Sequence, residues 1–83
     1  MNKDFLDNYL EMYMNELRRY VGKVYWQDYN EVIIVDVFGG IAGPPFYMCK
    51  WLWCDYVFCS DPLDVLSNFD DDGNPIVPDR VTN

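Results

Sequence analysis

The side chains of this 83-residue chain that are best suited to chemistry are its carboxylates, which outnumber Lys and Arg by fourteen to six. The chain has no His, and its formal net charge is −8. Most acids lie toward the two ends, because residues 32–54 contain only one, Asp36. An apolar centre bordered by carboxylates is suited to presenting a negative surface to a positively charged partner.

The spacing of the acids indicates how they could act together. Asp4, Asp7 and Glu11 are three and four residues apart, so on a helix their Cβ atoms form one stripe at about 5–6 Å spacing. Phosphates along a DNA strand recur on a comparable scale. The same pattern is also typical of a charged face that only keeps a protein in solution. On the first interpretation, the partner-binding residues are Asp4, Asp7, Glu11, Asp61, Asp64, Asp70, Asp71 and Asp72, with Tyr47 and Trp51 as aromatic anchors.

Enzyme activity is not indicated. Without His, the ordinary base that activates a Ser or Cys nucleophile is missing. The glycines of residues 39–43 lack the Lys-Ser/Thr ending of a P-loop, and prolines follow where a helix should begin. Asp36 is the best single acid/base candidate, but strand alternation explains it as an outward-facing position. We expect no enzyme activity and no cofactor.

The three cysteines, Cys49, Cys54 and Cys59, form an odd set in a chain without a secretion signal, which indicates reduced thiols. Zinc needs four ligands, and the fourth could only be a carboxylate here. Buried apolar packing is the favoured interpretation for these residues.

Residues 68–79 look like an EF-hand calcium loop, with Asn68, Asp70 and Asp72 at alternate positions, Gly73 at the sixth and Asp79 at the twelfth. The resemblance covers these twelve residues only. Two prolines lie inside the loop, Asp replaces the bidentate Glu, and no helix pattern follows. A solvated acidic turn is the favoured interpretation, and weak calcium binding is the alternative.

Helical periodicity over residues 4–21 predicts an amphipathic helix, with Gly22 as its C-terminal cap. Glu16, on the apolar half, could reach Arg19 at i+3, or Lys23 or Lys50 across the fold. Ser60-Asp61-Pro62 predicts a short second helix that ends near Asn68.

Between the helices, Val- and aromatic-rich runs predict strands at residues 24–27 and 32–38, joined by a turn at residues 28–31. We expect the face with Ile33, Val35 and Val37 to pack on the helix. Residues 46–59 could form one long strand, a hairpin that turns near residues 53–55, or a buried helix, and their composition favours strand.

These elements predict an α+β fold, with an N-terminal helix on a three- or four-stranded antiparallel sheet and a short second helix. We expect one domain at residues 1–69 and an extended or mobile acidic tail at residues 70–83.

The first functional hypothesis is a non-enzymatic inhibitor that occupies the nucleic-acid-binding surface of a basic partner protein by presenting carboxylates in place of phosphates. Phage anti-CRISPR, anti-restriction and repair-enzyme inhibitors share this size and charge, as an analogy of composition alone. The negative charge argues against direct binding to nucleic acid or to an anionic membrane. The N-terminus lacks the pattern of a signal peptide, so we expect a cytoplasmic protein. The alternative is a structural or assembly protein that homodimerises or docks through an aromatic surface.

Overall fold

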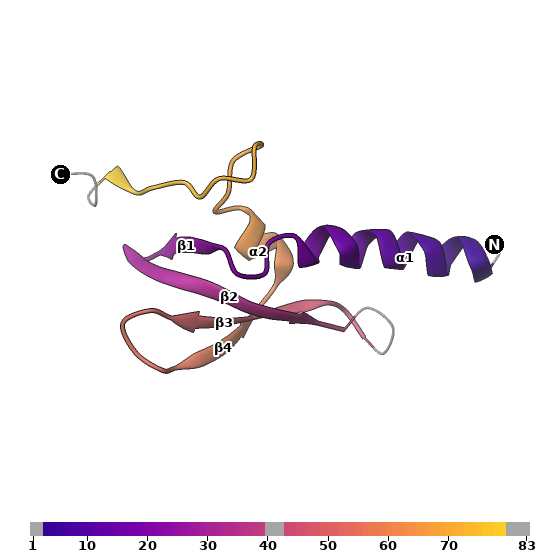
Figure 1. Cartoon of the computed structure of the whole chain (residues 1–83), viewed down its shortest axis with the longest axis horizontal. Helices are drawn as coiled ribbons and strands as arrows, with labels where there is room; N and C mark the ends of the chain where they lie inside the picture. The colour runs from indigo at the N-terminus through magenta and orange to yellow at the C-terminus, as the bar shows by residue number, and fades with distance from the viewer. Residues whose placement is uncertain (1–2, 40–42, 80–83) are drawn as a thin grey trace.

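The computed structural model describes residues 3–39 and 43–79, and side chains from residue 9 onward within these ranges. Four strands form one antiparallel sheet in the order β1-β2-β3-β4. Figure 1 shows the arrangement of the elements, which are α1 (Lys3–Arg18), β1 (Val24–Gln27), β2 (Asn30–Phe38), β3 (Phe46–Trp51), β4 (Val57–Ser60) and α2 (Pro62–Leu66). The predicted α+β fold is therefore confirmed, with four strands. Neither helix in the described part of the chain is long and apolar enough to cross a membrane.

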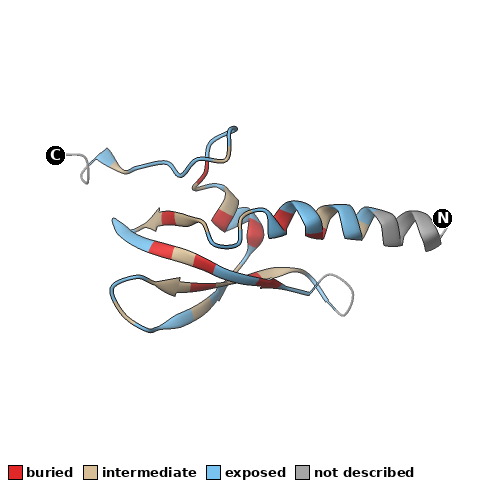
Figure 2. Ribbon diagram, viewed as in Figure 1, coloured by how far each residue is buried: buried red, intermediate tan, exposed pale blue. Residues whose placement is uncertain are grey.

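Among its described side chains, helix α1 buries those near its C-terminal end. Met14 and Leu17 are buried in the core, whereas Tyr9 and Met12 are 61% and 69% exposed. Figure 1 shows the N-terminal part of α1 extending beyond the sheet, and Figure 2 shows the buried residues in the part of the helix next to the sheet. The apolar stripe of α1 is therefore longer than the surface that covers it.

The end of α1 is tightened by short-range hydrogen bonds. The N–H groups of Arg19 and Tyr20 donate to the carbonyls three residues earlier, each at 3.2 Å. Gly22 adopts a φ of +91°, which favours glycine, and its N–H donates to Ile34 of β2 at 2.7 Å. The helix ends three residues before the predicted boundary, because the chain must turn here to enter β1.

The β1–β2 hairpin has a two-residue turn rather than the predicted four-residue turn. Asp28 and Tyr29 have φ values of +50° and +65°, and two positive values at these positions define a type I′ turn. Asn30 and Glu31 belong to β2, where they pair with Gln27 and Trp26.

The prediction of the buried face of β2 was right for Val37 and wrong for the residues before it. Val32 and Ile34 are fully buried, whereas Val35 is 44% exposed. The register shifts between Ile34 and Asp36, and this bulge returns Val37 to the buried face. Simple alternation cannot predict one inserted residue, so the sequence pattern assigned Ile33 and Val35 to the core in place of Val32 and Ile34.

Residues 46–60 form a hairpin, β3–β4, which decides between the alternatives that the sequence left open. Cys49 pairs with Phe58, and the rings of Phe58 and Trp51 lie 5.2 Å apart. The backbone N–H of Leu52 donates to the carbonyl of Glu31 at 3.0 Å. The turn of this hairpin is thus tied to β2, at the same end of the sheet as the β1–β2 turn (Figure 1).

Helix α2 begins at the predicted cap, because Asp61 Oδ1 accepts a hydrogen bond from the N–H of Leu63 at 2.8 Å. Val65 of α2 and Phe69 after it join the core cluster that also contains residues of α1 and the inner sheet face. Both helices therefore cover the same face of the sheet. The other face carries no helix among the described residues.

Residues 70–76 begin the C-terminal segment with a turn that is fixed to the core. The N–H of Asp70 donates to Asn74 at 2.8 Å, and that of Ile76 donates to Asn68 at 2.9 Å. The ammonium group of Lys23, just before β1, donates a hydrogen bond to the carbonyl of Gly73 at 2.8 Å. The acidic run thus has a defined position at the start of the segment that the sequence predicted to be extended or mobile.

Candidate functional site

Three of the predicted contact acids lie on α1. Asp4 and Asp7 belong to the described backbone of the helix, but their side chains lie outside the described part. Glu11 is exposed near the middle of α1. Its carboxylate is thus accessible to a partner.

Glu16, near the end of α1, forms an ion pair with Arg19 at 3.1 Å. This is one of the three alternative pairings that the sequence predicted. Both side chains are largely exposed, so this pair adds little stability. The pair does neutralise the Glu16 charge locally. Substitution of Glu16 can therefore be compared with substitution of a carboxylate that has no such partner.

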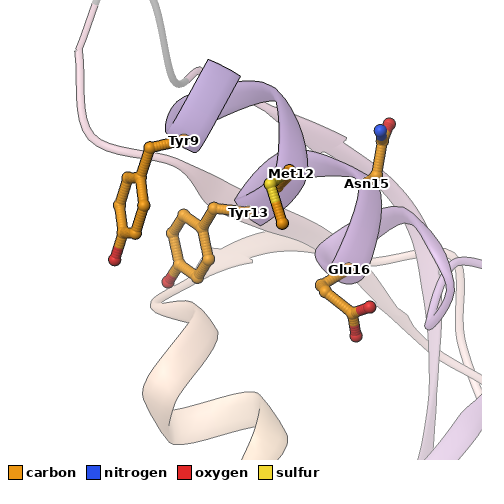
Figure 3. Close-up of a pocket in the computed structure, with 5 residues that line it drawn as sticks. All are labelled: Tyr9, Met12, Tyr13, Asn15 and Glu16. Atoms are coloured by element: carbon orange, nitrogen blue, oxygen red, sulfur yellow. The ribbon is translucent and has the colours of Figure 1, made fainter. Parts of the chain in front are cut away.

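Figure 3 shows a shallow hollow on α1, with the rings of Tyr9 and Tyr13 on the same side of the helix and Met12 and Glu16 beside them. The hollow has a volume of about 340 Å³. It continues the uncovered part of the apolar stripe.

The two acids of α2 differ in their local roles. Asp61 caps the helix through Oδ1, so part of its hydrogen-bonding capacity is already used. Asp64 is exposed, and its carboxylate has no partner among the described residues. Only Asp64 of this pair is therefore entirely available to another molecule.

The turn at residues 70–74 brings acids and bases together. Asp70 Oδ1 accepts from the N–H groups of Asp72 and Asn74, each at 2.9 Å, so Asp70 organises the turn itself. Asp71 and Asp72 are exposed. They lie along a hollow of about 520 Å³ whose lining also includes Glu16, Arg19, Tyr20, Lys23 and Gly73. The structure thus places these two acids next to the end of α1, where the two bases partly offset their charge.

Tyr47, predicted as an aromatic anchor, is fully buried, and its hydroxyl donates to the carbonyl of Leu17 at 2.6 Å. It joins β3 to the end of α1 and cannot reach a partner in this structure, so it is withdrawn as a contact residue. Side chains alternate between the two faces of the sheet along β3, and Tyr47 lies on the inner face, toward the helices. Trp51, the other predicted anchor, is half-buried, with Trp53 at 6.5 Å and Phe58 at 5.2 Å between ring centroids.

A third hollow, of about 340 Å³, lies between the turns of the two hairpins. Its lining residues are Trp26, Tyr29, Asn30, Glu31, Leu52 and Trp53. The sequence pattern did not predict this site, because it assigned Glu31 to a turn. A two-residue turn at Asp28-Tyr29 would have shown that Glu31 lies opposite Trp26 on the same face of the hairpin.

Comparisons with known protein families, curated proteins and solved structures find no match to this chain. Any functional proposal must therefore be argued from the chain's own residues.

The described residues contain no group of three or more Cys, Asp or Glu side chains placed to hold a metal ion. Cys49, Cys54 and Cys59 are free thiols. Cys49 is buried and accepts a long hydrogen bond from the Tyr25 hydroxyl, at 3.7 Å. Burial raises the pKa of the Cys49 thiol, which disfavours the nucleophilic thiolate.

Asp36 is exposed, and its Oδ1 accepts from the N–H of Val37 at 2.7 Å. The interpretation of Asp36 as an outward-facing strand residue is confirmed.

Proposed function

We propose that this chain is a non-enzymatic binding protein that occupies the positively charged, nucleic-acid-binding surface of a partner protein. One observation carries the proposal. Within the described residues, the carboxylates of Glu11, Asp64, Asp71 and Asp72 are exposed and have no hydrogen-bond or ion-pair partner. Exposed charges without a partner in their own chain are the ones that a cationic surface can pair with at the lowest desolvation cost.

The size of the charge limits what the protein can imitate. Its longest dimension is 53 Å, and a DNA duplex of that length carries about 30 phosphate charges at one charge per ~1.7 Å. The formal charge of the chain is −8. The protein therefore matches a short local run of phosphates, and we propose that it blocks part of a nucleic-acid site rather than replacing a whole duplex.

The test begins with the immobilised chain as bait for a lysate, followed by purification of the proteins retained at low salt. The proposal requires that a retained protein binds a labelled DNA or RNA duplex and that the soluble chain displaces that duplex. It also requires that displacement weakens steeply as salt is added, because exposed charge pairs are screened. The proposal would be refuted by a partner that binds no nucleic acid, or by one that keeps its duplex bound when the chain is present at a saturating concentration.

Two matched variants separate local carboxylates from total charge. Glu11→Gln with Asp64→Asn removes two unpaired acids, whereas Glu16→Gln with Asp36→Asn removes two acids that already have partners in the chain. Both variants carry the same net charge. At roughly 0.2–1 kcal/mol for each exposed pair, the first variant should displace the duplex about twofold to thirtyfold less effectively, and the second should match the wild type.

A second candidate function, self-association or docking through apolar contacts, is favoured by the exposed side chains of the β3–β4 turn. Leu52, Trp53 and Tyr56 are 49%, 70% and 64% exposed. Exposed aromatic groups of this kind often mark a partner surface. Sedimentation of the purified chain at two concentrations tests for a dimer, and Trp53→Ala should dissociate that dimer if the turn forms it.

Calcium binding at residues 68–79 stays a prediction that titration with a chelator control would test. Two observations disfavour it. The Asp70 carboxylate accepts hydrogen bonds from two backbone N–H groups, and the Lys23 ammonium donates a hydrogen bond to the Gly73 carbonyl. A cation at this turn would lie close to that ammonium charge.

A further inference from the structure

The hollow between the two hairpin turns combines aromatic rings with a carboxylate. Trp26, Tyr29 and Trp53 contribute rings to its lining, and Glu31 contributes the charge. None of the six lining residues is basic. Aromatic faces and a carboxylate attract the same kind of group, a cation with an extended surface.

The sheet register explains why these groups meet. Trp26 and Glu31 are directly opposite each other in the β1–β2 hairpin, so their side chains lie on one face. Leu52 and Trp53 come from the other hairpin, which is held beside β2 by the hydrogen bond from the Leu52 N–H to the Glu31 carbonyl. The hollow is therefore built on paired strands rather than on a free loop.

Tyr29 stands at a position where another residue type would suit the backbone better. A positive φ at both residues of a type I′ turn favours Asn or Gly, and a bulky side chain there is uncommon. The chain has Tyr at this point, 51% exposed and in the lining of the hollow. Its ring thus forms part of the surface that a ligand in the hollow would contact.

We propose that this hollow binds the side chain of an arginine that the basic partner presents. The planar guanidinium can stack on the rings of Trp26 or Trp53 while its N–H groups donate to the Glu31 carboxylate. A lysine ammonium is a compact, strongly hydrated charge and would use the ring faces less well. This inference rests on the proposed function, because it names the group on the cationic partner that this end of the molecule contacts.

The experiment uses the whole chain and a defined probe. N-acetyl-arginine methylamide is titrated into ¹⁵N-labelled protein, and the indole N–H signals of the three tryptophans are followed after assignment with single Trp→Phe variants. The matched control is N-acetyl-citrulline methylamide, which has nearly the same shape but no charge. We expect the arginine compound to shift the Trp26 and Trp53 signals with a dissociation constant on the order of millimolar, because one cation–π contact and one exposed ion pair are weak.

Variants locate the interaction. Trp53→Ala removes an exposed ring, and we expect it to weaken arginine binding about twofold to fivefold. Glu31→Gln should weaken binding by up to about fivefold. Glu16→Gln makes the same change of net charge on α1, at a carboxylate already paired with Arg19, and should leave binding unchanged. Each variant alters an exposed side chain, so thermal unfolding should confirm an intact fold.

Each outcome is informative. Equal shifts with arginine and citrulline, no shift with either, or tighter binding of the corresponding lysine compound would overturn the proposal. So would self-association of the wild-type chain that Trp53→Ala abolishes, because a second copy would then occupy the hollow. If arginine does not bind while the Glu11/Asp64 variant still loses duplex displacement, only this inference fails. If arginine binds but no duplex is displaced, the proposed function fails and the arginine site stands.

Discussion

The two ends of the molecule present negative charge in different ways. Toward one end, α1 carries the exposed Glu11 beside an exposed apolar side chain, Met12. At the other end, Glu31 lies among aromatic rings that two hairpins hold together. Salt should therefore weaken contacts at the helix end more than those at the hairpin end, where ring stacking adds a component that salt screens little.

The largest effect should appear within α1 itself. Leu17→Ala removes a fully buried side chain and should lower the free energy of unfolding by about 2–5 kcal/mol. Met12→Ala, at an exposed position of the same helix, should change it by less than about 0.5 kcal/mol. Urea unfolding measures both. Similar losses for the two variants would show that Met12 is covered in solution.

Alkaline pH should destabilise the region between the two ends. Burial is the main cause that raises the pKa of Tyr25 and of Tyr47, so the folded chain keeps protons that the unfolded chain loses above about pH 10. Below pH 10 the two tyrosines should contribute their full stabilisation to the folded chain. Above pH 10 it should fall by up to about 1.4 kcal/mol per pH unit for each tyrosine.

Urea midpoints between pH 9 and pH 11 measure this slope, and Tyr47→Phe provides the control. That variant loses the hydrogen bond to Leu17, worth about 1 kcal/mol, at every pH. It should also flatten the alkaline slope. An unchanged slope would contradict the assignment of the pH dependence to this residue.

The smallest effect should come from the turn at the hairpin end. Tyr29→Gly replaces a residue at positive φ with the type that the turn prefers, so the thermal midpoint should not fall by more than a degree or two. Arginine binding should nevertheless weaken, because one ring of the hollow is removed. A large loss of stability with unchanged binding would assign Tyr29 to the fold instead.

Much of the fold could be predicted from local signals. The cap at Asp61 and the boundaries of β1 follow from residues close together in sequence, and the structure confirms both. Gly22 was predicted as the cap of α1, but the helix ends at Arg18 and the Gly22 N–H donates to Ile34 of β2 instead. The buried face of β2 could not be predicted, since the bulge near Val35 changes the alternation without a distinctive residue type. The two-residue turn was missed because Asp-Tyr is not among the pairs that usually mark it.

The candidate site was predicted less completely than the fold. Exposure of Glu11, Asp64, Asp71 and Asp72 followed from charge alone. Tyr47 was misassigned because an aromatic side chain in a strand can face either way, and only the register shows which. The hollow at the hairpin turns depends on pairing between residues of different strands, which composition and spacing along the chain do not encode.

The order of the strands in the sheet also bears on how the chain folds. Because β1 to β4 follow one another in sequence and each pairs with the next, most of the sheet can assemble by successive closure of short hairpins. The contact between Lys23 and Gly73, by contrast, joins residues 50 positions apart. On a ribosome, the helix and the hairpins are synthesised before the acidic turn emerges, so we expect that turn to be the last part to attach.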